Sequence, residues 1–183
     1  NVVAARRKLL HFMVLDSEKE NLGIEGYPPE LSLYLSLLAT TGLHRQDEQG
    51  RWRFCKPARG GSKLALLWQS LDQSFGRDGA GSFSLADVYQ HWQRPPYGIK
   101  RGVLPILATA FLLARSDDLA IYVDDNFVTE FGDFTIDRML QDPAAIRIRR
   151  VEISGVAEST LQHVANFVAA DFGGGENRTA LEI

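Results

Sequence analysis

The stretch RPPYGIKRGVLPILATAFLLA, residues 94–114, decides the fold of this chain. Its Pro-Pro-Tyr-Gly sequence predicts a rigid turn, Lys100 and Arg101 follow, and residues 102–114 carry no charged side chain. A transmembrane helix needs about 20 consecutive apolar residues, and this run is shorter and has charged residues on both sides. A helix that is hydrophobic on all sides is buried inside a protein. We therefore predict the central core helix of a small domain, and no contact with a membrane.

The segments on either side of this helix follow the order of a winged-helix domain. Apolar residues at helical spacing predict a helix over residues 62–76, followed by a short extended piece at 82–84. Ser84 and Asp87 then form a capping-box pattern that starts a second helix. After the apolar helix, residues 119–131 predict two strands around an Asp-Asp-Asn turn. We accordingly predict an α+β, mainly helical fold with a winged-helix-like architecture, that is, a helix-turn-helix plus a β-hairpin wing.

The N-terminal part resembles the second half of this pattern. Pro28 and Pro29 precede an apolar helix that Gly42 is expected to end, and a hairpin follows around the turn DEQG at 47–50. Both segments contain Pro-Pro, then Leu-Ala-Thr inside an apolar helix, then a hairpin. We interpret this as a weak internal repeat and predict a tandem winged-helix-like architecture. The alternative is a chance likeness between two apolar helices.

The remaining predicted elements complete a division into three parts. They are a helix over 5–15, a short helix from Phe134 that Pro143 ends, a strand over 145–153 and a helix over 155–172. The parts are an N-terminal helical region with a helix–hairpin unit (1–60), a winged-helix-like domain (61–153) and a C-terminal helix with a linker (154–183). The chain starts without methionine and stops after a Gly-rich break, which predicts a fragment that continues into a missing downstream region.

The composition favours an ordinary globular protein over a protein that binds nucleic acid or membranes through its overall charge. Hydrophobic residues make up 45% of the chain and charged residues 23%, and the net charge is −3. The single cysteine, Cys55, excludes an internal disulfide framework and a multi-cysteine zinc site. These features agree with a reducing compartment, and we predict a cytoplasmic protein.

No sequence motif predicts catalysis, a cofactor or a metal. The loop ARGGSK (58–63) lacks the first glycine and the residue order of a phosphate-binding P-loop. No nucleophile-elbow sequence is present. The four histidines are far apart and show no zinc-site spacing; they are His11, His44, His91 and His163. We predict a chain that is not an enzyme and that binds no cofactor.

Basic residues at two places are the candidate contacts to a partner or to nucleic acid. The first group lies around the start of the apolar helix and consists of Arg94, Lys100 and Arg101. The second lies in the strand AIRIRRVEI and consists of Arg147, Arg149 and Arg150. The apolar phase of this strand changes between Ile148 and Val151, which predicts a bulge that would place the three arginines on one surface. An arginine cluster binds phosphate and carboxylate equally well, so it favours a partner without identifying one.

The apolar helix at residues 102–114, which is the third helix of the winged-helix pattern, argues against sequence-specific DNA recognition. A winged helix commonly places this helix in the major groove, but beyond Gly102 it offers base edges almost no hydrogen-bonding group. Asp124 and Asp125 at the hairpin tip would repel phosphates. We predict an interaction or scaffold module whose partner is another protein or another domain of its parent chain. A DNA-binding winged helix that contacts phosphates through the basic residues is the alternative.

Three of these segments resemble a known family: the PPYG turn, the apolar helix behind it and the hairpin LAIYVDDNFV. They are similar to the winged-helix-like accessory region of large multidomain bacterial P-loop ATPases, including phage-defence proteins of the BREX type and their relatives. The likeness covers residues 84–140, with weaker support from GYPPELSLYLSLLATTGLH. It implies a module associated with an ATPase, without catalytic residues of its own, because neither Walker sequence occurs in this chain.

Overall fold

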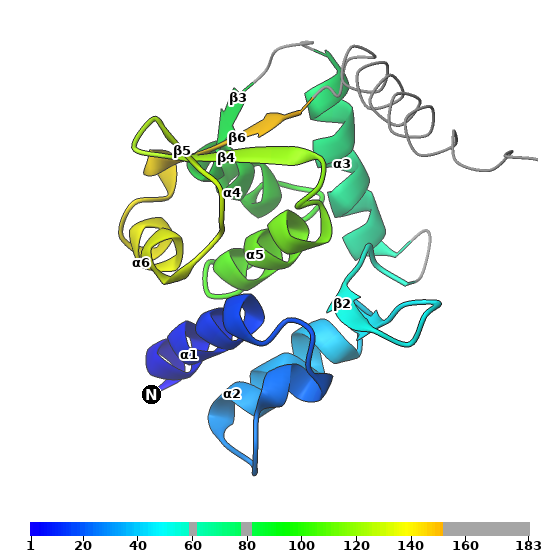
Figure 1. Cartoon of the computed structure of the whole chain (residues 1–183). Coiled ribbons are helices and arrows are strands. Elements are labelled where there is room, and N and C mark those ends of the chain that lie inside the picture. Colours follow the sequence, from blue (N-terminus) through cyan, green and yellow to red (C-terminus); the bar gives the residue numbers. More distant parts are fainter. Residues whose placement is uncertain (59–61, 78–81, 152–183) are drawn as a thin grey trace, which may run out of the picture. The chain divides into compact units, whose positions relative to one another are not determined.

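Helix α5 (Leu104–Ala114) is the central element of the fold, and every residue from Leu104 to Leu112 is buried. In the computed structural model it lies between α1 and the larger β-sheet (Figure 1). The prediction of a core helix is confirmed. The structure describes residues 1–58, 62–77 and 82–151, and residues 1–150 form one compact unit.

The described residues form an α+β fold that is about half helical, with six α-helices and two small antiparallel sheets. Besides α5, the helices are α1 (Val2–Leu15), α2 (Pro29–Tyr34), α3 (Lys63–Arg77), α4 (Leu85–Gln93) and α6 (Asp133–Gln141). The strands are β1 (His44–Gln46), β2 (Trp52–Phe54), β3 (Ser82–Ser84), β4 (Leu119–Val123), β5 (Asn126–Val128) and β6 (Ile146–Arg150). Short 3-10 turns lie at Glu20–Gly23 and Pro143–Ala145, and α2 continues into a π-helical turn at Leu35–Ala39. The predicted helix over 155–172 lies outside the described residues.

Two helix starts differ from the sequence-based prediction. Helix α1 begins at Val2, earlier than expected, because the side chain of Asn1 caps it by accepting a hydrogen bond from the amide of Val3 at 3.0 Å. Helix α5 begins at Leu104, later than expected, so Lys100 and Arg101 precede the helix. The α4 capping box, formed by Ser84 and Asp87, is confirmed.

The larger sheet has the strand order β3-β6-β4-β5. The hairpin of β4 and β5 was predicted, and its turn residues Asp124 and Asp125 have φ angles of 47° and 63°, as a tight two-residue turn requires. Strand β6 lies between β3 and β4, an arrangement that the sequence did not reveal. The predicted hairpin of β1 and β2 forms a separate two-stranded sheet.

The apolar residues of all parts of residues 1–150 belong to one core. Within it, Trp68 of α3 stacks against Trp92 of α4, with ring centroids 6.3 Å apart. Trp68 and Phe111 of α5 also form an edge-to-face pair, with ring centroids 5.3 Å apart. These aromatic contacts join three helices around the middle of α5, and such pairs add about 0.5–1.5 kcal/mol beyond the area they bury.

Arg115 fixes the C-terminal end of α5 to its surroundings. Its side chain is buried and forms ion pairs with Asp72 of α3 and, at 3.0 Å, with Asp118. Its guanidinium also lies 5.9 Å from the ring centroid of Phe111. A buried charge is tolerated when it is paired in this way.

A buried histidine joins the N-terminal segments. Nε2 of His44 lies 2.8 Å from the carbonyl oxygen of Ser17 and therefore donates to it, because a carbonyl only accepts. Nδ1 is 2.9 Å from the hydroxyl of Tyr34, which donates in turn. Burial lowers the pKa of His44 and raises the pKa of Tyr34 to about 12, so both groups are neutral in the folded protein near neutral pH.

Gly42 ends the π-helical turn, as predicted, with a φ of +69°. A Cβ at this position would lie 2.6 Å from Cβ of Ala58, and the left-handed backbone alone costs a non-glycine residue about 1–2 kcal/mol. We expect Gly42→Ala to lower the free energy of unfolding by more than this backbone cost. Gly50→Ala is the matched control, because Gly50 has a φ of +77° and no neighbour within 4 Å. Urea denaturation of both variants measures the difference, and equal losses would contradict the close approach of Ala58.

We expect the His44 network to make the stability of the protein depend on pH. A group whose pKa is lowered on folding stabilises the protein fully above its ordinary pKa, about 6.5 for histidine. This contribution is lost as the pH falls from there through the lower pKa of the folded state. Urea denaturation between neutral and mildly acidic pH should therefore show wild type losing stability relative to His44→Gln, whose side chain does not titrate. A constant difference between the two proteins over this range would contradict the prediction.

Candidate partner-binding surface

The outer face of the larger sheet carries the most distinctive exposed group of side chains. Buried and more exposed residues alternate along β4 and β6, because successive side chains point to opposite faces of a sheet. The inner face contributes Ile121, Val123, Ile146 and Ile148 to the core. The exposed and half-buried residues of the opposite face form what we call the outer sheet face; they are Ser82, Ala120, Tyr122, Phe127, Arg147 and Arg149.

Strand pairing arranges these residues in two rows. Phe127, Tyr122 and Arg147 are direct partners across β5, β4 and β6. Ala120, Arg149 and Ser82 form the second row across β4, β6 and β3. Directly paired residues project from the same face of a sheet, so the aromatic pair lies directly beside Arg147, and Arg149 lies in the neighbouring row.

The arginines of this surface carry charge that no carboxylate offsets within the described residues. Arg147 and Arg149 are exposed and take part in none of the ion pairs found there. Nε of Arg147 donates to the hydroxyl of Ser82 at 3.0 Å, which orients the guanidinium across the sheet toward β3. The surface therefore presents oriented positive charge.

The aromatic part of the surface is an edge-to-face pair. The ring centroids of Tyr122 and Phe127 lie 5.7 Å apart with an angle of 61° between the planes. Phe127 is 58% exposed although the ring is apolar. An exposed aromatic ring beside uncompensated arginines is typical of binding surfaces.

Arg150 does not belong to this surface, and the predicted bulge is wrong. The pairing of β4 with β6 runs without interruption from Ile146 to Arg150. In a regular ladder Arg150 projects from the face opposite to Arg147 and Arg149, opposite Leu119. The change of apolar phase arises because Arg150 lies at the exposed end of the strand.

The other predicted basic group lies elsewhere. Arg94 is the C-terminal cap of α4, and Lys100 and Arg101 lie in the turn before α5; all three are exposed. This turn runs close to α1, since a Cβ at Gly102 would lie 3.8 Å from Nη1 of Arg6. Strand β6 lies on the other side of α5 (Figure 1). The structure thus separates Arg94, Lys100 and Arg101 from the arginines of β6.

No family model, no curated protein and no solved structure matches the chain. The resemblance to the accessory region of bacterial ATPases therefore stays a prediction.

Other kinds of site find no support in the described residues. There, no group of three or more His, Cys, Asp or Glu side chains is placed to hold a metal ion. Within the same part of the chain, no helix combines the length and apolar character that crossing a bilayer requires. A shallow cavity of about 490 Å³ lies beside the β1–β2 hairpin, and its lining includes Glu18, Asp47, Arg51, Trp52 and Arg53. The charged groups there offset each other, because Asp47 pairs with Arg51 at 3.1 Å and lies 3.9 Å from Arg53.

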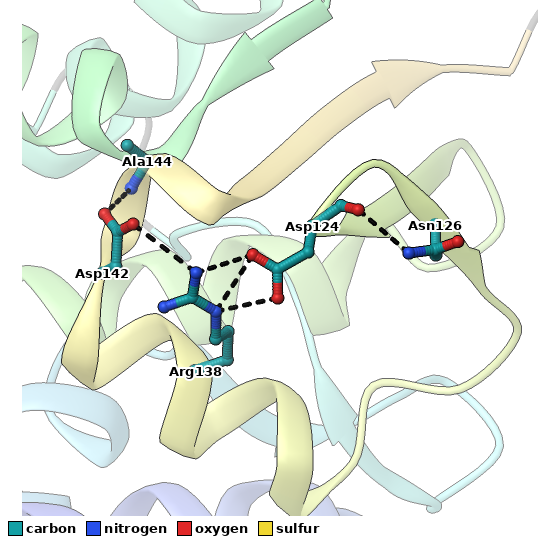
Figure 2. A network of polar contacts seen from close by, with 5 residues as sticks. All are labelled: Asp124, Asn126, Arg138, Asp142 and Ala144. Carbon is teal, nitrogen blue, oxygen red and sulfur yellow. Dashed lines mark hydrogen bonds and ion pairs between the residues drawn. The ribbon is translucent and has the colours of Figure 1, made fainter.

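Arg138 of α6 holds the tip of the β4–β5 hairpin (Figure 2). Its Nε and Nη2 lie 2.6–3.1 Å from the two carboxylate oxygens of Asp124, and Nη2 is 3.7 Å from Asp142. The hydrogen bonds from Arg138 lower the pKa of the Asp124 carboxyl. The carboxylate of Asp142 also accepts a hydrogen bond from the amide of Ala144 at 3.0 Å, and the side-chain amide of Asn126 donates to the carbonyl of Asp124 at 2.9 Å. The predicted repulsion of phosphates by Asp124 is therefore offset by a paired arginine.

The sequence contained a signal for the aromatic residues that the prediction did not use. In LAIYV, Tyr122 alternates with Ile121 and Val123, and this predicts that it faces away from the core. The two-residue turn then fixes Phe127 directly opposite Tyr122. Their position beside Arg147 depends on the pairing of β4 with β6, which local periodicity does not show.

We expect Arg138→Gln to loosen the hairpin tip without unfolding the protein. The amide of Asp124 donates to the carbonyl of Ala145 at 2.9 Å, and the ion pair holds these segments together. Hydrogen exchange should become faster at the amide of Asp124. Arg7→Gln is the control, because it removes an ion pair with Asp137 at the exposed contact of α1 with α6. Equal exchange at Asp124 in wild type and Arg138→Gln would show that the ion pair does not order the turn.

Proposed function

We propose that this chain is a non-catalytic, winged-helix-like interaction module that binds a negatively charged partner through its outer sheet face. The order α3, β3, α4, α5, β4, β5 supports a winged-helix-like description. The insertion of β6 between β3 and β4 is a departure from that simple pattern. The proposal includes a second, related unit over residues 28–55.

The observation that carries this proposal is the contrast between α5 and the outer sheet face. A helix that reads the major groove needs an exposed face with hydrogen-bonding side chains. In α5 the residues from Leu104 to Leu112 are all buried, and its one polar residue in that range, Thr109, is 0% exposed. Helix α5 is therefore used for packing, and the partner binds to a surface outside this helix.

The charge of the outer sheet face indicates the sign of the partner. The whole chain has a net charge of −3, yet Arg147 and Arg149 are exposed side by side on β6 with no ion pair among the described residues. By comparison, Arg7, Arg51, Arg115 and Arg138 each pair with an aspartate. Arginine binds carboxylate and phosphate groups through two parallel hydrogen bonds, so these two guanidinium groups, which form no ion pair with any described residue, favour an anionic partner.

Retention on a heparin column compares the two basic regions without assuming the identity of the partner. We expect wild type to bind at about 50 mM salt and Arg147→Gln/Arg149→Gln to elute at a clearly lower salt concentration, because polyanion binding weakens with each lost contact. Lys100→Gln/Arg101→Gln is the matched control, since it removes the same charge from the turn before α5. It should elute close to wild type.

The opposite order of elution, or equal elution of both variants, would contradict the proposed surface. A wild-type protein that is not retained would do the same. Thermal denaturation of each variant checks that the fold is intact, which we expect because all four side chains are exposed.

A further inference from the structure

We infer that the partner of the outer sheet face is single-stranded nucleic acid, with bases stacked on Phe127 and Tyr122 and phosphates bound by Arg147 and Arg149. This inference rests on the proposed function and names the chemistry of the partner. It follows from the aromatic residues, the spacing of the charges and the shape of the surface, taken in turn below.

The aromatic residues provide a place for unpaired bases. Phe127 is 58% exposed, and its ring contacts that of Tyr122, so the two rings form one continuous apolar surface on β5 and β4. Every base has a flat π face, and stacking on an exposed aromatic ring contributes about 1–3 kcal/mol per base with little dependence on sequence. An acidic peptide would use the arginines but has no chemical need for these rings.

The arginines lie where the phosphate backbone of a nucleic acid with stacked bases needs positive charge. Neighbouring strands are about 4.8 Å apart, so Arg147, two strands away from Phe127 in the same row, lies roughly 10 Å from it along the sheet. Arg149 lies two residues farther along β6, about 7 Å from Arg147. One stacked nucleotide and its neighbours can thus reach both guanidinium groups.

The carboxylates of the hairpin tip do not block the surface between the aromatic rings and the arginines. Asp124 at the hairpin tip is paired with Arg138. Asp125 is exposed in the turn that joins β4 and β5, past their last paired residues, Val123 and Asn126. These two negative groups therefore lie at the hairpin tip, and the two arginines lie on β6, the strand next to β3.

The shape of the surface favours a single strand over a duplex. A major groove accepts a helix or a two-stranded ribbon, whereas this surface spans four strands. The bases of a duplex are also stacked on each other and are not free to contact Phe127. Unpaired bases can instead be spread over a sheet and stacked on its aromatic residues.

The test is a fluorescence anisotropy titration of the whole chain with a labelled single-stranded thymidine oligonucleotide at low salt. We expect Phe127→Leu, which keeps an apolar side chain but removes the ring, to weaken binding roughly 5- to 100-fold. Phe134→Leu is the matched control, because Phe134 is another exposed phenylalanine, 68% exposed, on α6. It should bind as tightly as wild type.

The salt dependence of the same titration tests the arginines. Each phosphate contact to single-stranded nucleic acid contributes about −0.7 to the slope of log K against log salt. Arg147→Gln and Arg149→Gln should each reduce the slope by about that amount, while Lys100→Gln should leave it unchanged.

Two results would overturn this inference while leaving the proposed function intact. One is equal affinity of wild type and Phe127→Leu, and the other is tighter binding of a duplex than of the single strand. If heparin retention still depended on Arg147 and Arg149, the first result would point to an acidic protein segment as the partner, and the second to a nucleic-acid duplex. Heparin retention that is independent of these arginines would instead contradict the proposed function itself.

Discussion

The burial of α5 on all sides is the constraint on which the rest of the structure depends. A helix whose residues from Leu104 to Leu112 are all buried needs other elements around its whole circumference. Helix α1, the stacked tryptophans of α3 and α4, and the inner face of the sheet supply this cover. Even the polar end of the helix follows the same rule, because Arg115 is buried only together with its aspartate partners. The N-terminal elements are therefore part of the core that makes α5 possible.

This arrangement leaves the outer sheet face as the proposed binding surface. Every exposed feature of that face follows from strand alternation once the inner face is committed to covering the core. Ile146 and Ile148 point inward, so Arg147 and Arg149 must point outward, and the same holds for Tyr122 between Ile121 and Val123. Packing and the proposed binding thus use opposite faces of the same strands.

The parts of the fold that the sequence predicts are those set by neighbours along the chain. The apolar run identified α5, the Ser84–Asp87 spacing identified the start of α4, and the Asp124–Asp125 turn identified the β4–β5 hairpin. The start of α5 was placed too early because the chain folds back first, with the amide of Ile99 bonded to the carbonyl of Trp92 at 2.9 Å. The position of β6 was not predicted, since its pairing depends on contacts between distant segments. For the same reason the two arginines of the binding surface were named, but their aromatic neighbours and the exclusion of Arg150 were not.

The central position of β6 also determines the order in which the sheet can be completed. Arg147 of β6 contacts Ser82, 65 residues earlier in the chain, and β6 is the strand that connects β3 to the β4–β5 hairpin. Among the described strands, β3 has no neighbour and β4 has a partner on one side only until the ribosome has released β6. Closing so long a loop is slow compared with forming helices or a hairpin. During synthesis the nascent chain therefore carries an incomplete sheet with unpaired strand edges. How long these edges are open to aggregation depends on how quickly residues 146–150 are synthesised and pair with them.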